Sequence, residues 1–148
     1  MATIAIAADH AGVALKAELV AELAKLGQPT LDLGPSDTSS VDYPDYATKV
    51  TAAVTDKRAS LGILICGTGT GMAITANKVH GIRAALSRSE FEARMAVQHN
   101  DANVLCLGAR VTGGALAIEI MKAFLAASFE GGRHAKRVEK ITQVEAQR

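Results

Sequence analysis

Short apolar segments rich in β-branched residues alternate with longer segments of helical period along this chain. The apolar segments read TIAIAA, PTLDL, LGILIC, IRAALS and NVLCLGA. Parallel strands need a crossover between them, and a helix usually supplies it, so this alternation is typical of a parallel sheet. We therefore expect an α/β fold of three α/β/α layers, built on a five-stranded, parallel, Rossmann-like sheet.

The helical segments are expected at residues 12–27, 46–58, 70–79, 90–98 and 114–127. In the first of them, Leu15, Leu19, Leu23 and Leu26 form one apolar stripe that would face the sheet. The last segment, EGGRHAKRVEKITQVEAQR, has a Gly-Gly break and a charged helical pattern with no strand after it. It predicts an extra C-terminal helix that reaches beyond the rest of the fold. A length of 148 residues suits one domain, residues 1–148.

Composition excludes several classes of partner. Sixteen Lys and Arg against 15 Asp and Glu leave a formal net charge of +1, so no bulk basicity would recruit nucleic acid or an anionic membrane. Aromatic residues make up 3% of the chain, too few to stack a row of bases. Two cysteines, a start without signal-like character and no apolar run of membrane length predict a reduced, cytoplasmic protein. No His or Cys spacing indicates a metal site.

Polar residues follow the expected strands. In open α/β sheets, ligands bind beyond the carboxyl ends of the strands. Asp9 and His10 follow the first apolar segment, Tyr43 lies in the expected loop after the second, and Arg110 follows the fifth. Asp9 also fits a simple helix N-cap, and Tyr43 before a proline also fits a packed loop aromatic. Their convergence on one edge favours a binding site.

The segment ICGTGTGMAITANK contains a glycine loop with Gly67, Gly69 and Gly71. A dinucleotide fingerprint needs glycine where Met72 stands, and a P-loop needs Gly-Lys-Ser/Thr where the chain reads Gly-Met-Ala. NAD and ATP are therefore disfavoured. The loop instead offers backbone N–H groups at a helix N-terminus, which stabilise a phosphate or a developing oxyanion.

Cys66 stands at the mouth of this loop, where the same field would favour its thiolate as a base or a nucleophile. The alternative is a buried strand-end cysteine without chemistry. Cys106 lies between Leu105 and Leu107 and is expected in the core.

Two more groups carry chemistry near the end of the chain. Arg133 and Arg137 are four residues apart, hence on one helix face, and two guanidinium groups suit a phosphate. A merely solvated basic face is the alternative. His99 and Asn100 precede the fifth apolar segment, where a histidine can cap a helix end or act as an acid.

Five motifs in order, AADHAG, DYPDYA, CGTGTGMAITANK, HNDANVLCLGAR and GGRHAKRVEKI, resemble those of the type B ribose-5-phosphate isomerases over essentially the whole chain. That family interconverts ribose 5-phosphate and ribulose 5-phosphate, a step of the pentose phosphate pathway, without metal or cofactor. Related members act on six-carbon sugar phosphates. The resemblance implies a sugar phosphate as the substrate and no cofactor.

The resemblance also implies roles for individual residues. Cys66 would be the base, His99 the acid that assists ring opening, Thr68 the group beside Cys66 that handles a hydroxyl proton, and Asp9 a group that orients hydroxyls. The expected substrate-binding residues are Tyr43 and Asn100 for the sugar, the amides of Gly67, Gly69, Thr70 and Gly71 for the enediolate, and His10, Arg110, Arg133 and Arg137 for the phosphate.

Strand direction separates these residues. Cys66 ends the third strand whereas His99 precedes the fifth, so in a parallel sheet they lie at opposite edges, and a five-residue strand spans roughly 16 Å. We therefore expect a homodimer whose sites combine Cys66 of one chain with His99 of the other. Two alternatives remain open at this point: a non-catalytic module that binds a phosphate or nucleotide, and a thiol enzyme with a covalent intermediate.

Overall fold

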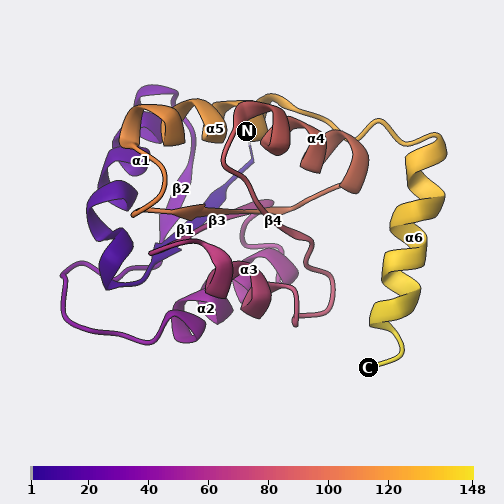
Figure 1. Cartoon of the computed structure of the whole chain (residues 1–148), viewed down its shortest axis with the longest axis horizontal. Coiled ribbons are helices and arrows are strands. Elements are labelled where there is room, and N and C mark those ends of the chain that lie inside the picture. Colours follow the sequence, from indigo (N-terminus) through magenta and orange to yellow (C-terminus); the bar gives the residue numbers. More distant parts are fainter. Residues whose placement is uncertain (1) are drawn as a thin grey trace.

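The computed structural model describes residues 2–148 as a layered α/β fold (Figure 1). The elements in chain order are β1 (Ile4–Ala8), the 3₁₀-helix η1 (His10–Gly12), α1 (Val13–Lys25), β2 (Thr30–Asp32), α2 (Tyr43–Thr55), β3 (Leu61–Cys66), α3 (Thr70–Ala76), β4 (Ala84–Leu86), α4 (Glu90–Asn100), β5 (Val104–Gly108), α5 (Gly114–Ala126) and α6 (Arg133–Glu145).

The sheet has five strands in the order β2-β1-β3-β5-β4, and each neighbouring pair is parallel. Helices α1, α4 and α5 cover one face, and α2 and α3 cover the other (Figure 1). The expected three-layer fold with a parallel five-stranded sheet is therefore confirmed.

Strand β3 shows how the two apolar cores arise. Its residues alternate between the faces of the sheet, so Ile63 and Ile65 enter the core under α1, α4 and α5, whereas Leu64 and Cys66 enter the core under α2 and α3. All of these side chains are buried. A strand buried on both faces must be apolar throughout, which is why LGILIC could be recognised as a central strand.

Two helix boundaries differ from expectation and move predicted site residues. The helix α2 begins at Tyr43 rather than at residue 46, so Tyr43 lies in a first helical turn and not in a loop. Pro44 is compatible with this start because the first amides of a helix have no intrahelical partner. The helix α4 continues to Asn100, two residues beyond the expected end, and stops at Asp101, which adopts a left-handed conformation.

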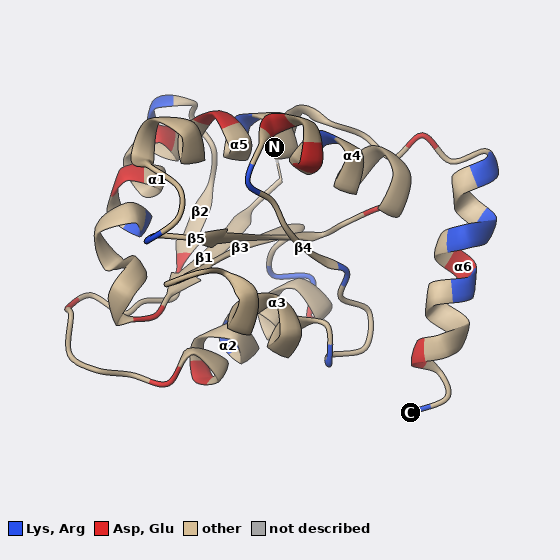
Figure 2. Ribbon diagram, viewed as in Figure 1, with Lys and Arg blue, Asp and Glu red and all other residues tan. Residues whose placement is uncertain are grey.

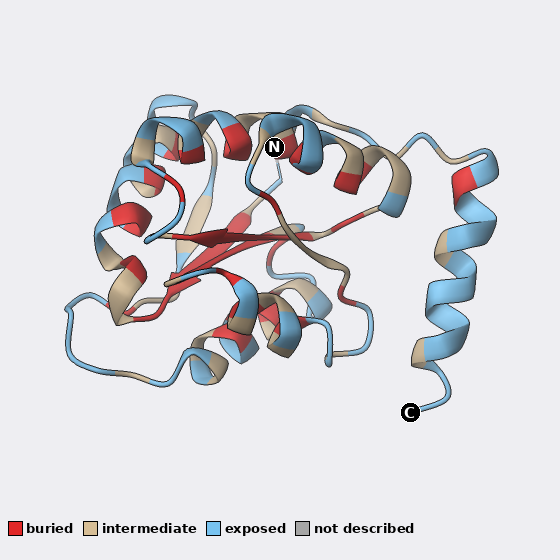
Figure 3. Ribbon diagram, in the orientation of Figure 1, coloured by how far each residue is buried: buried red, intermediate tan, exposed pale blue. Residues whose placement is uncertain are grey.

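The expected C-terminal helix is present as α6, which stands beside the layered part of the fold (Figure 1). It contacts α4, and near its C-terminus Glu145 accepts a hydrogen bond from the Gly81 amide at 2.9 Å. Most of its surface is exposed (Figure 3), and basic residues gather in its N-terminal half (Figure 2). This helix thus leaves most of its side chains outside both cores.

None of the helices formed within residues 2–148 has the length and apolar character needed to cross a membrane.

Candidate active site

The candidate site lies at the carboxyl ends of the neighbouring strands β1 and β3. Strand order places β2 on one side of β1 and β3 on the other, so successive connections leave this pair in opposite directions. Such a switch point opens a crevice between the two loops that follow the strands. The amide of Asp9 donates a hydrogen bond to the Ile65 carbonyl at 2.9 Å, which holds the segment after β1 against the end of β3.

Cys66 is the last residue of β3 and has 5% of its surface exposed. The amide of Gly69 donates a hydrogen bond to Cys66 Sγ at 3.2 Å. Gly69 makes this possible with a φ of 82°, and a Cβ there would lie 2.6 Å from Leu86 Cδ1. The loop therefore turns back on β3 and directs a backbone N–H at the sulfur.

Cys106 provides the contrast that the sequence predicted. It is fully buried in the same core as Cys66. Burial raises the pKa of the Cys106 thiol, and the neighbouring Cys66 raises it further. Cys106 therefore stays protonated and packs as an apolar residue, as expected.

Arg110 and Tyr43 flank the glycine loop. The Arg110 amide donates to the Gly67 carbonyl at 2.9 Å, and the guanidinium lies against Gly67. On the other side, a Cβ at Gly71 would lie 2.5 Å from Tyr43 Cε1. Glycine at position 71 thus lets the tyrosine ring approach the backbone at the start of α3.

The amides of the loop are not all equivalent. The Gly69 amide is engaged by Cys66, and the Thr70 amide donates to Thr68 Oγ1 at 3.3 Å. Thr68 itself is exposed beside Cys66. Two of the amides that were expected to bind an anion therefore donate within the loop itself, to Cys66 and to Thr68.

Asp9 and His10 open η1 at the same edge of the sheet. Asp9 is buried and its carboxylate accepts a hydrogen bond from the Ala11 amide at 2.9 Å, so it does cap this short helix. His10 Nδ1 accepts from the Val41 amide at 3.2 Å. A neutral imidazole that accepts at Nδ1 carries its proton on Nε2, which leaves Nε2 able to donate to a phosphate oxygen.

The remaining predicted residues lie at the opposite edge. The pairing of β3 with β5 aligns Gly62 with Val104 and Cys66 with Gly108, so the helix end that precedes β5 is at the amino edge of the sheet. His99 and Asn100 form that helix end, and Arg133 and Arg137 belong to α6 beside it. The structure thus brings together a carboxyl-edge group, Asp9, His10, Tyr43, Cys66, Gly67, Thr68, Gly69, Thr70, Gly71 and Arg110. It places His99, Asn100, Arg133 and Arg137 elsewhere in the same chain.

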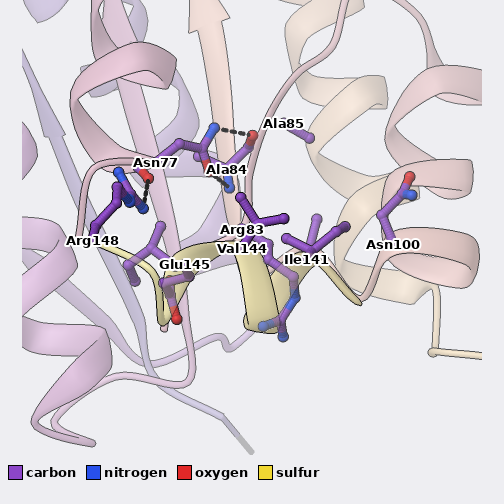
Figure 4. A pocket seen from close by; sticks show the side chains of 11 residues that line it. Asn77, Arg83, Ala84, Ala85, Asn100, Ile141, Val144, Glu145 and Arg148 are labelled. Carbon is purple, nitrogen blue, oxygen red and sulfur yellow. Dashed lines mark hydrogen bonds between the residues drawn. The ribbon is translucent and has the colours of Figure 1, made fainter. Parts of the chain in front are cut away.

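A groove of about 340 Å³ lies between α6 and the layered part of the fold (Figure 4). Asn100, Arg83 and Ala85 line one side, and Ile141 and Val144 of α6 line the other. The two aliphatic side chains are 47% and 63% exposed. The groove is therefore an open, largely apolar surface next to the amino-edge residues and away from Cys66.

Two residues near His99 were missed by the sequence analysis. Glu130 Oε1 lies 3.4 Å from His99 Nε2, and the ring of His134 stacks on that of His99 with centroids 4.1 Å apart. Burial lowers the pKa of His134, and His99 and Arg133 lower it further, against the opposite effect of Glu130. The spacing of Glu130 and His134, four residues apart across a Gly-Gly pair, was the available signal.

Comparisons with known proteins identify the family of this chain. A family model described as Ribose/Galactose Isomerase matches residues 4–141. Ribose-5-phosphate isomerase B of Escherichia coli is 47% identical over 148 residues, covering 100% of this chain and 99% of that protein.

Two solved structures are similar throughout. A ribose-5-phosphate isomerase B from Clostridium thermocellum has a TM-score of 0.97 and 49% identity over 98% of both chains. A type B ribose 5-phosphate isomerase from Trypanosoma brucei has a TM-score of 0.94 and 46% identity, covering 97% of this chain and 99% of that one. The resemblance predicted from the motifs is confirmed: the chain belongs to the Ribose/Galactose Isomerase family.

Proposed function

We propose that this protein is an aldose-ketose isomerase that interconverts ribose 5-phosphate and ribulose 5-phosphate through an enediolate. The observation that carries the proposal is the position of the Cys66 thiol at the switch point, beside the glycine loop. Its sulfur accepts a hydrogen bond from the Gly69 amide. Relatives that match along the whole chain are named ribose-5-phosphate isomerase B, which supports this choice of substrate.

The proposed chemistry is a proton transfer between neighbouring carbons. The Cys66 thiolate removes the proton from C2 of the open-chain aldose and returns it to C1, while a proton passes from O2 to O1 beside Thr68. A proton next to a carbonyl is weakly acidic, so the reaction needs a positioned base and fixed dipoles where the negative charge develops. The amides of Gly67 and Gly71 are placed in the loop that would supply those dipoles.

The separation of the two residue groups supports a shared site. In one chain His99 and Asn100 lie about a strand length from Cys66, roughly 16 Å for five residues. Arg133 and Arg137 lie on α6, which contacts α4. We propose a homodimer in which this amino-edge group of one chain completes the carboxyl-edge group of the other, with both sites equivalent by two-fold symmetry. His99 would then open the furanose ring, and Arg133 and Arg137 would join His10 and Arg110 around the phosphate.

The exposed aliphatic surface of α6 fits this assembly. Ile141 and Val144 line an open groove instead of a core, and apolar side chains gathered on an exposed surface indicate a contact with another chain. Pairing would bury this face and would bring α6 over the second subunit.

The test is a ketose-formation assay on ribose 5-phosphate, allose 6-phosphate and galactose 6-phosphate. We expect the highest kcat/KM with ribose 5-phosphate; preference for allose 6-phosphate would instead make the protein an isomerase of six-carbon sugar phosphates. Reaction from ribulose 5-phosphate in D₂O should place deuterium at C2 of the aldose without a trapped thiol adduct. No conversion of any of the three sugars, with retained phosphate binding, would identify a non-catalytic phosphate-binding module.

A role in the pentose phosphate pathway remains a prediction that follows from this substrate. A cytoplasmic location remains a prediction that follows from the free cysteines.

A further inference from the structure

Three potential metal ligands converge where α4, the α5–α6 connection and α6 meet. One ligand atom from each of His99, Glu130 and His134 lies within 4.8 Å of the other two. Glu130 Oε1 is 3.4 Å from His99 Nε2 and 3.7 Å from His134 Nε2. Sequence spacing relates only Glu130 and His134, because His99 reaches the cluster from a distant helix.

The backbone around the three residues is held in place. The Glu130 amide donates to the Gln98 carbonyl at 3.0 Å, which fixes the connection to the end of α4. Gly131 and Gly132 follow with φ of 66° and 54°, and this left-handed turn returns the chain so that His134 lies beside Glu130. His134 is buried, whereas His99 and Glu130 are open to solvent on one side.

The separations suit a tetrahedral ion. Zinc binds imidazole nitrogen and carboxylate oxygen at about 2.0–2.2 Å, so two ligand atoms of a tetrahedral site stand about 3.4 Å apart. Two of the three separations in the cluster are already close to this value. The two imidazole rings are stacked nearly parallel, at 11°, and an imidazole nitrogen binds a metal in the plane of its ring. One ring must therefore leave the stack and swing its Nε2 toward the other before both bind one ion.

We propose that His99, Glu130 and His134 form a binding site for Zn²⁺, with two imidazole nitrogens and one carboxylate oxygen as protein ligands. Three protein ligands leave a fourth position for a water molecule. Zn²⁺ at this site engages Nε2 of His99 and removes it from proton transfer. The consequence for catalysis rests on the proposed function, because it requires His99 as the acid; the binding itself does not.

The types of ligand atom, and not the neighbouring charges, determine which ion the site prefers. Arg133 and Arg137 repel any cation held beside His134, as they already disfavour its protonation. A hard ion such as Mg²⁺ depends on several oxygen ligands and waters, whereas imidazole selects zinc, copper and nickel. The site is therefore selective for Zn²⁺ over Mg²⁺ and Ca²⁺.

Zinc affinity is measured on the full chain by competition with a chromophoric chelator, at fixed pH and without phosphate. Wild type should bind one Zn²⁺ per chain and should not respond to Mg²⁺. Loss of a group that merely supports a metal ligand costs 10- to 100-fold in affinity, so Glu130→Gln and His134→Gln should each lose at least about tenfold. Glu130 is 51% exposed, which makes Glu130→Gln informative even if His134→Gln folds poorly.

Two control variants separate this site from others. His80 is an exposed histidine outside the cluster, and His80→Gln should bind zinc like wild type. Cys66→Ala should also bind like wild type, and Co²⁺ in place of Zn²⁺ should show no sulfur-to-cobalt charge-transfer band. Unchanged affinity in Glu130→Gln and His134→Gln, or loss of binding in Cys66→Ala, would overturn the proposal.

Activity gives a second readout. Zinc should inhibit ketose formation by wild type, a chelator should restore it, and Glu130→Gln should need at least about tenfold more zinc for the same inhibition. Inhibition that is equally strong in Glu130→Gln would show that another site mediates it. A chain with no isomerase activity would refute the proposed function alone, since the binding measurement does not depend on turnover.

Discussion

At the scale of single residues, two cysteines share one core and differ in what surrounds them. Cys106 is enclosed by apolar side chains, and burial raises the pKa of its thiol. Cys66 lies at the edge of that core, where a backbone N–H reaches its sulfur. Position at a strand end, more than residue type, distinguishes a candidate base from a packing residue.

Cys66→Ala should abolish isomerisation while the fold and phosphate binding stay nearly intact, because a base acts in the transition state and contributes little to ground-state binding. General-base catalysis is worth about 10²–10⁴-fold, so kcat should fall by at least that lower value. Cys106→Ala is the matched control and should remain active. Ketose formation by Cys66→Ala above about a tenth of the wild-type rate would show that Cys66 is not the base.

His134 makes stability depend on pH. The folded-state pKa of His134 lies below the ordinary histidine value of 6.5, chiefly because of burial. The unfolded chain therefore binds more protons in this range, and the free energy of unfolding falls as the pH drops through 6.5 toward the lower folded value. Urea unfolding between pH 7.5 and about 5.5 should show a shallower decline for His134→Gln than for wild type. The exposed His80→Gln should keep the wild-type slope, and parallel slopes for all three proteins would contradict the assignment.

At the scale of elements, the local sequence pattern predicted some helix and strand boundaries correctly and others incorrectly. The bounds of β3 were predictable because a strand buried on both faces is apolar throughout. The start of α2 was not predicted because a Tyr-Pro pair fits a loop as well as a helix start, since proline is compatible with a first helical turn. The end of α4 was not predicted because Asp101 ends the helix in a left-handed conformation. Aspartate can adopt this conformation, but its presence in a sequence does not indicate it.

The arginines of α6 provide the prediction at this scale. Arg137→Ala and Arg133→Ala should each raise KM for ribose 5-phosphate by about tenfold or more, since each removes a charge-assisted contact to the phosphate. Lys140→Ala, on the same exposed helix, should change KM little. Inorganic phosphate should compete with substrate in wild type. Unchanged KM in both arginine variants would show that Arg133 and Arg137 form only a solvated basic face of α6.

At the scale of the whole molecule, the predicted site residues fall into two groups at opposite edges of the sheet. The residues of both groups could be predicted from the sequence motifs, and the separation of the two groups could be predicted from the direction of the strands. Strand order could not be predicted, because it depends on how the helices pack rather than on any local pattern. The contact of Glu130 and His134 with His99 was missed for the same reason, since it joins α4 to a connection far along the chain.

The shared site is tested by mixing two inactive proteins. Equal amounts of Cys66→Ala and His99→Asn chains are denatured and refolded together, and random pairing gives about half heterodimers. Each heterodimer would carry one doubly altered and one intact site, so about a quarter of wild-type activity should return. Each variant refolded alone, and wild type taken through the same procedure, are the controls. A mixture that stays inactive while wild type recovers would mean that both residues serve a site within one chain.

The position of α6 outside both cores has a kinetic consequence. The sheet and the helices α1 to α5 bury the apolar clusters among themselves, so their folding does not need α6. A site completed by α6 of a second chain would then form only after two folded subunits meet. Circular dichroism after dilution from denaturant should recover at a rate independent of protein concentration, and activity should follow later in a second-order phase that slows as the protein is diluted.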